Sequence, residues 1–225
     1  MSTAASTINA KFTMDVGDDD SLVRAGDLDK LFPPTWNAPT LEQALRDLGV
    51  PELSEVLACC RDVAENAPQR QFISHEEATV LASYTFDFGQ NTPHFDSNPY
   101  RLVNTALVNR AMLPLRRSRG FLYLILQALR KLPRFVPPMH MLYRGITRRV
   151  NLDQQHYYQG NTVTWHGFSS TSPSLQVTQG FLAQEASKKG TPIDGTLFII
   201  TAATSMTSSL WGYDITEYSC IPGEK

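Results

Sequence analysis

The sequence contains no apolar stretch long enough to cross a membrane. Its longest apolar cluster, residues 121–129, includes Gln127. It falls well short of the roughly 20 apolar residues that a bilayer-spanning helix requires. Residues 1–10 are small and polar, without the basic and apolar regions of a secretory signal. We therefore expect no membrane span and a cytoplasmic location.

Cysteines and metal-ligand patterns are scarce. Three cysteines, Cys59, Cys60 and Cys220, do not make a disulfide framework, and the adjacent pair has neither zinc-ligand nor CxxC redox spacing. None of the five histidines lies in an HExxH or similar ligand pattern. The sequence therefore predicts reduced thiols, with Cys60 filling core space, and no metal site.

The chain also lacks an excess of charge of one sign. Lys and Arg total 20 and Asp and Glu total 22, which gives a formal net charge of -2. This balance argues against a chain-wide basic field, so we expect no nucleic-acid partner. Walker A, GxGxxG and GxSxG signatures are absent as well. Several common classes of catalyst are thereby excluded.

The chain does contain enough material for one large domain with a modest extension. Its 225 residues, 42% hydrophobic and 19% charged, can bury a sizeable core. Residues 1–38, with an acidic run and several prolines, predict a flexible arm. Residues 39–225 form the predicted domain, helical over about 39–135 and strand-rich over about 136–225. Helices followed by strands predict an α+β fold.

Capping residues mark the first helices. Thr40 and Gln43 have capping-box spacing, and Gly49 ends the helix that they open. A second helix is expected where apolar residues recur at positions 53, 56, 57 and 60. Ser74 and Glu77 repeat the capping box and predict the start of a third helix.

Proline is expected to separate the last two helices of this part. The pattern predicts a fourth helix over residues 101–112. Pro114 should break it, and Ser118 should cap a fifth helix that continues with apolar residues at helical spacing.

The second part of the domain, residues 136–225, has the sequence pattern of short strands. We expect strands over residues 139–145 and 161–169, the latter because its side chains alternate. A short helix is expected over 174–187, then a buried strand over 195–202. Residues 213–215 could form one more short strand.

Three segments of this part carry polar groups suited to a nucleotide. Arg144 ends an apolar strand, where it can hold a phosphate bidentately while Gly145 lets a ligand approach the backbone. Residues 168–172 place several hydroxyls at a predicted strand end, and Glu224 lies in the turn-rich segment 218–225. Each segment alone has a simpler interpretation, as a surface ion pair, a helix cap and a loop acid respectively.

Taken together and in this order, the segments resemble the arginine-specific mono-ADP-ribosyltransferases of the R-S-E class. Tyr143-Arg144-Gly145 matches the arginine at a strand end, and Ser170-Thr171-Ser172 after Phe168 matches the Ser-Thr-Ser element. Pro222-Gly223-Glu224 matches the Glu-x-Glu loop as far as its first glutamate. The resemblance covers about residues 70–225.

The resemblance implies a fold, an activity and a co-substrate. The fold would be ADP-ribosyltransferase-like, with two packed short β-sheets around a cleft that binds NAD. The enzyme would transfer ADP-ribose from NAD to exposed arginine side chains of a partner protein and release nicotinamide, without a metal.

The resemblance also implies roles for individual residues. Arg144 would bind the NAD phosphates, and Ser170 would hold NAD and orient the catalytic glutamate. Glu224 would receive the acceptor guanidinium, and Tyr218 would face the substrate or pack in the core. The residues implied in NAD binding are Arg144, Gly145, Ser170, Thr171 and Ser172; those implied in catalysis are Arg144, Ser170 and Glu224.

The sequence departs from the family pattern at its end. The catalytic second glutamate would follow Lys225, so we expect the chain to be truncated within Glu-x-Glu. Two alternatives stay open: an inactive domain of this kind that binds a nucleotide or a partner, and an NAD glycohydrolase in which water replaces arginine.

Overall fold

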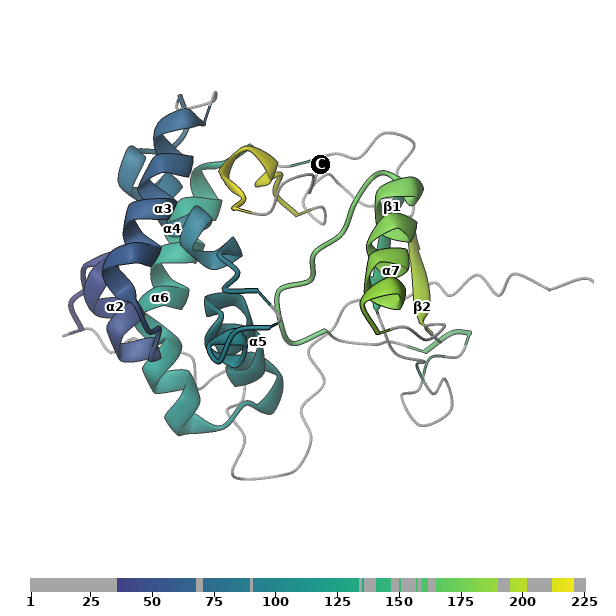
Figure 1. The fold of residues 1–225 in the computed structure, drawn as a ribbon, viewed down its shortest axis with the longest axis horizontal. Helices are drawn as coiled ribbons and strands as arrows, with labels where there is room; N and C mark the ends of the chain where they lie inside the picture. Colours follow the sequence, from purple (N-terminus) through teal and green to yellow (C-terminus); the bar gives the residue numbers. More distant parts are fainter. Residues whose placement is uncertain are drawn as a thin grey trace, which may run out of the picture.

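The computed structural model divides into a helical body and a smaller unit of two strands and one helix (Figure 1). Residues 1–35 of the expected arm, and the predicted site residue Glu224, lie outside the described residues. The structure describes residues 36–67, 71–89, 91–133, 135, 141–146, 150, 157, 159–161, 165–189, 195–201 and 212–220.

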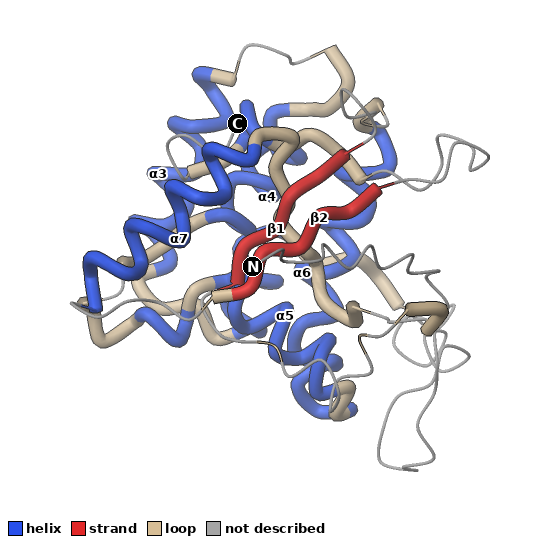
Figure 2. The backbone as a smooth tube through the Cα atoms, turned by 90° about the vertical axis from the view of Figure 1, so that its right-hand side faces the viewer, coloured by secondary structure: helices blue, strands red, loops and turns tan. Residues whose placement is uncertain are grey.

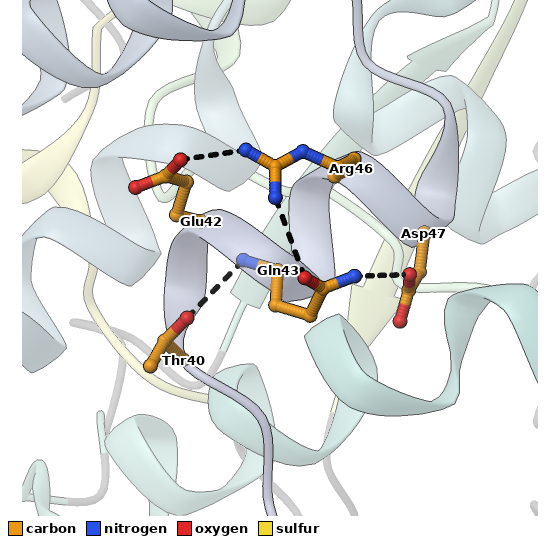
Figure 3. A network of polar contacts seen from close by, with 5 residues as sticks. All are labelled: Thr40, Glu42, Gln43, Arg46 and Asp47. Atoms are coloured by element: carbon orange, nitrogen blue, oxygen red, sulfur yellow. Dashed lines mark hydrogen bonds and ion pairs between the residues drawn. The ribbon is translucent and has the colours of Figure 1, made fainter.

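Helix α2 (Leu41–Leu48) begins and ends as its capping residues predict. The Thr40 hydroxyl accepts a hydrogen bond from the Gln43 N–H at 3.2 Å, and Gly49 ends the helix with a left-handed φ of 92°. Exposed side chains of the helix form a polar network (Figure 3), in which the Gln43 amide donates to Asp47 rather than closing the capping box. The opposite face of α2 is buried.

Helices α3 (Leu53–Asn66) and α4 (His75–Thr85) pack against each other in the body. The capping box that opens α4 is confirmed, because the Ser74 hydroxyl accepts from the Glu77 N–H and the Glu77 carboxylate accepts from the Ser74 N–H. Every residue of α4 from Ala78 to Thr85 is buried, so α4 is the central helix of the body.

The expected break at Pro114 is wrong. Helix α5 (Pro99–Asn109) ends at Arg110, whose φ of 51° is left-handed, and α6 (Met112–Lys131) then runs through Pro114. Proline is tolerated there because the N–H groups of a helix's first turn have no partner within the helix. Ser118 lies inside α6, where its hydroxyl donates to the Pro114 carbonyl at 2.9 Å.

Helix α6 organises the core of the body. It contacts α2, α4 and α5, and its Phe121 and Ile125 are almost fully buried. Gly120 allows the chain before α2 to approach closely, since a Cβ built on it would lie 2.7 Å from the ring of Pro39. Just before Pro39, the Trp36 ring packs edge-on against Tyr123 of α6 at 5.0 Å.

The smaller unit consists of strands β1 (Met141–Ile146) and β2 (Thr196–Thr201) and helix α7 (Leu175–Lys189). The strands pair antiparallel, with Arg144 opposite Phe198, and α7 packs on β1 (Figure 2). Strand β2 is not fully buried as expected, because Ile199 is 58% exposed. One face of β2 therefore lies at the surface.

Two other expected strands are wrong in the residues that the structure describes. Within 161–169, the described positions 161 and 165–169 form no strand. Residues 213–215 form no strand beyond an isolated bridge at Tyr213, and the short 3-10 helix η5 (Thr216–Tyr218) follows them against the helical body. A second 3-10 helix, η2 (Phe95–Ser97), precedes α5. The fold is thus mixed α+β, as predicted, and the two packed sheets stay a prediction.

Candidate functional site

Arg144 and the segment 170–172 lie in direct contact. The Arg144 guanidinium donates a hydrogen bond from Nη1 to the Ser170 carbonyl at 2.8 Å. Next to it, Tyr143 and Ser172 exchange two backbone hydrogen bonds of 2.8 Å in an isolated antiparallel bridge. Two of the three sequence elements, 26 residues apart at Arg144 and Ser170, therefore form one site.

The sheet directs Arg144 and Gly145 to opposite faces, because side chains alternate along a strand. A Cβ on Gly145 would lie 2.9 Å from Leu182 of α7, so the Gly145 face is covered by that helix. Arg144 faces away from α7, on the side of its cross-strand partner Phe198. Close packing of α7 accounts for the glycine at position 145.

The Arg144 guanidinium lies against one ring of a cluster of three aromatic side chains. Its central carbon lies 5.3 Å from the centroid of the Trp165 ring, a cation–π distance. Trp165 contacts Phe198 edge-on at 5.2 Å and donates a 2.7 Å hydrogen bond from its indole nitrogen to the Tyr157 hydroxyl. Tyr157 packs on Phe198 at 5.3 Å, which closes the cluster. The guanidinium is thus held between the Ser170 carbonyl and the Trp165 ring, and the other two rings support Trp165.

The electrostatic surroundings of Arg144 favour an anion. Burial lowers the pKa of the half-buried guanidinium, and the hydroxyls of Tyr84 and Tyr157 oppose that shift. Within the described part of the chain, Arg144 forms no ion pair with a carboxylate. Arginine keeps its charge under these conditions and presents five donors, which can bind a phosphate bidentately. A ligand phosphate would compensate this charge.

Asn104 of α5 fastens the site to the helical body. Its side-chain oxygen accepts the Phe168 N–H at 2.7 Å, and its amide nitrogen donates to the Tyr84 hydroxyl at 3.1 Å. The Tyr84 and Phe168 rings also meet edge-on at 5.4 Å. A Cβ on Gly167 would lie 2.9 Å from the Asn104 oxygen, so only glycine fits there without displacing that oxygen. This tether fixes the start of the segment that leads to Ser170.

The three residues of the Ser-Thr-Ser element differ in exposure and therefore in what their hydroxyls can bind. Ser170 and Thr171 are exposed, whereas Ser172 is buried. The Ser172 hydroxyl accepts the Ser174 N–H at 3.1 Å, just before α7 begins, and so shapes the turn into that helix. Ser170 and Thr171 are the two whose side chains a ligand could reach.

Tyr218 packs in the core. It is only 3% exposed and lies among apolar side chains of α3, α4 and α6. Of the two interpretations of Tyr218, substrate contact or packing, the structure gives packing.

Sequence reasoning missed the residues that support Arg144. Trp165 was expected on a strand and Phe198 in a buried one, and neither was connected with the arginine. Asn104 and Tyr84 do not belong to any sequence motif. The available signal was weak, because no spacing sets Tyr157, Trp165 and Phe198 apart from the other aromatic residues of this part of the chain.

Comparisons with known proteins give the chain no relatives: no protein-family model, no characterised protein and no solved structure matches it. No cluster of three or more metal-ligating side chains occurs among the described residues. None of the described helices is long and apolar enough to span a membrane. The geometry around Arg144 is therefore the main guide to function.

Proposed function

We propose that this protein binds NAD at Arg144 and transfers ADP-ribose to arginine side chains of other proteins, releasing nicotinamide. The observation that carries the proposal is the 2.8 Å hydrogen bond from Arg144 to the Ser170 carbonyl. It joins the two motif segments on which the resemblance to R-S-E ADP-ribosyltransferases rests. It also fixes a cation that has no carboxylate partner among the described residues.

Arg144 supplies the anchor for the dinucleotide. Its remaining N–H groups bind phosphate oxygens of NAD as a planar fork, which lysine cannot reproduce. The exposed Ser170 hydroxyl lies beside this anchor and can hydrogen-bond a ribose hydroxyl. Trp165, already stacked on the guanidinium, keeps it oriented.

The reaction breaks the bond between the nicotinamide nitrogen and the ribose anomeric carbon. The bonding electrons leave with nicotinamide, and positive charge develops on the sugar. A guanidinium nitrogen of the acceptor then bonds to the anomeric carbon and loses a proton to water. Glu224 binds the acceptor guanidinium as a carboxylate partner, and the resemblance assigns stabilisation of the developing positive charge to the second glutamate of the family's Glu-x-Glu element.

The first test measures NAD binding. Arg144→Lys should weaken NAD binding by about tenfold or more in calorimetric titration, because a charge-assisted bidentate contact contributes roughly 1.5–3 kcal/mol. The matched control is Arg117→Lys, at an exposed position of α6, which should bind NAD like the wild type. Equal dissociation constants for Arg144→Lys and wild type would remove Arg144 from phosphate binding.

The second test measures transfer. It uses a chain that continues past Lys225, labelled NAD, and agmatine as the arginine analogue. Glu224→Gln should abolish labelling of agmatine and leave some nicotinamide release, because water needs no carboxylate anchor. NAD binding without nicotinamide release would instead support the nucleotide-binding alternative. Nicotinamide release without agmatine labelling in the wild type would support the glycohydrolase.

A further inference from the structure

Two cysteines that are distant in the sequence lie in contact in the helical body. Cys60 of α3 is completely buried, and Cys220 follows η5 and is half-buried. Their sulfur atoms lie 3.9 Å apart, although 160 residues separate them. This distance is van der Waals contact, about 1.9 Å longer than the S–S bond of roughly 2.0 Å.

The backbone around Cys220 is held against the body by several contacts. The Cys220 N–H donates to the Thr85 hydroxyl at 2.8 Å, and its thiol donates to the Ala82 carbonyl at 3.2 Å. Two residues earlier, Tyr218 is buried in the core. Cys60 belongs to α3 and Cys220 is bound to α4, and because these two helices pack against each other, side-chain rotation can bring the two sulfur atoms together.

We propose that Cys60 and Cys220 form a reversible disulfide, which fastens the segment ending at Cys220 to helix α3. This modification site is independent of the proposed NAD chemistry. It would covalently fix the chain four residues before Glu224.

Cys220 is the better nucleophile of the two. The hydrogen bond from the Cys60 thiol lowers the pKa of Cys220, burial opposes this, and the Thr85 hydroxyl lowers it further. The hydrogen bond to Cys220 and burial raise the pKa of Cys60. The thiolate is the reactive form of cysteine, and Cys220 is also the more accessible, so oxidation should begin there.

A peroxide serves as the two-electron oxidant. The Cys220 thiolate attacks one peroxide oxygen, the O–O bond breaks, and a sulfenic acid forms as hydroxide leaves. The Cys60 sulfur then bonds to the Cys220 sulfur and displaces the sulfenic oxygen as water. In balance, two thiols and one hydrogen peroxide give one disulfide and two waters. A dithiol reductant reverses the reaction by exchange.

Cys59 offers the control. It is exposed on α3, and partial desolvation of its thiol together with the nearby Cys220 raises its pKa. It cannot pair with Cys60 in a regular helix, because adjacent Cα atoms lie about 3.8 Å apart, closer than disulfides allow. It does compete with Cys60 for Cys220, so the test must distinguish the two pairings.

The experiment treats the reduced, folded 225-residue chain with one equivalent of hydrogen peroxide. Remaining thiols are alkylated, and the linked peptides are mapped by mass spectrometry without reduction. We expect the link between the peptides of residues 60 and 220 in the wild type and in Cys59→Ala. We expect its loss in Cys60→Ala, in the near-isosteric Cys60→Ser and in Cys220→Ala. Oxidised wild type should also melt at a higher temperature than reduced wild type, a difference that Cys220→Ala removes.

Three results would overturn the proposal. One is loss of the link in Cys59→Ala, and another is a link of wild-type yield in both Cys60 variants, since either would give the pairing to Cys59. The third is a link that joins two chains, visible as a dimer on a non-reducing gel. The melting temperatures of oxidised and reduced wild type are compared on one and the same chain. A folding defect of a variant therefore cannot be mistaken for the absence of the disulfide.

Discussion

Replacing Asn104 by alanine should destabilise the protein through the site segment. The change removes the acceptor of the 2.7 Å hydrogen bond from Phe168 and the donor of the 3.1 Å hydrogen bond to Tyr84. A polar group left without its partner costs about 1–3 kcal/mol. Because Asn104 is only half-buried, water can replace part of the loss, and we expect the lower half of that range. A decrease of about 1.5 kcal/mol is roughly tenfold in the unfolding equilibrium.

Gly167 lies close to the Asn104 side chain, so a double-mutant cycle on these two residues tests the same contact. In the wild type, Gly167→Ala would place its Cβ 2.9 Å from the Asn104 oxygen, and such overpacking costs about 1–3 kcal/mol. In the Asn104→Ala background that oxygen is gone, and the nearest remaining Asn104 atom is the Cβ, at 3.5 Å, which is ordinary contact. Gly167→Ala should therefore cost much less there, with a coupling energy of about 1 kcal/mol.

Urea denaturation of the four chains of this cycle gives each free energy of unfolding. Asn109→Ala is the matched control, since Asn109 is an exposed asparagine of the same helix. If Asn104→Ala is no more destabilising than Asn109→Ala, or if the two substitutions simply add, then the tether does not hold the site segment.

Two further predictions concern charge and glycine packing. Partial burial disfavours the Glu77 carboxylate, but hydrogen bonds from Lys131 and from Ser74 at the start of α4 outweigh this effect and lower the pKa of Glu77. The ionised Glu77 therefore stabilises the fold above its unfolded pKa of about 4.3, and this stabilisation is lost as the pH falls through the lower folded pKa. Glu77→Gln should therefore flatten the acid side of the stability–pH profile, and an unchanged profile would argue against this. Gly120→Ala should lower the melting temperature, because its Cβ meets Pro39 at 2.7 Å, whereas Gly180→Ala on α7, with open space, should raise stability by about 0.5–1 kcal/mol. Equal shifts for the two alanines would contradict the packing argument.

Local signals explain why the helices of the first part could be predicted. The Thr40 and Ser74 caps act within three residues of themselves, and Gly49 ends α2 through its own φ. Such interactions depend on little beyond the neighbouring sequence, so they are visible in it. The same holds for α7, which begins after Ser174 as expected.

The errors arose where position within an element, or contact with a distant one, decides the outcome. Pro114 breaks a helix interior but is tolerated in a first turn, and the sequence pattern did not show that α6 begins at Met112. Residues 165–169 alternate like a strand, yet these described residues form none, and the Phe168 N–H donates to the Asn104 side chain of α5. Alternating side chains show only that a segment has different surroundings on its two sides. A segment held between the helical body and the smaller unit meets this condition as well as a strand in a sheet does.

The candidate site depends both on short sequence motifs and on contacts between distant segments. The order of the Arg144 and Ser170 segments could be read from the sequence, because each is a short motif. Their contact depends on the folded arrangement, because the backbone bridge between Tyr143 and Ser172 holds the two segments side by side. Trp165, which contacts the guanidinium, packs with Phe198 from another segment, and Asn104 of α5 binds the backbone of nearby Phe168. Arg144 lies within β1 rather than at its end as expected, and without these supports it would be an ordinary strand arginine. The prediction that most directly tests the site is therefore made on Asn104, which lies outside every motif.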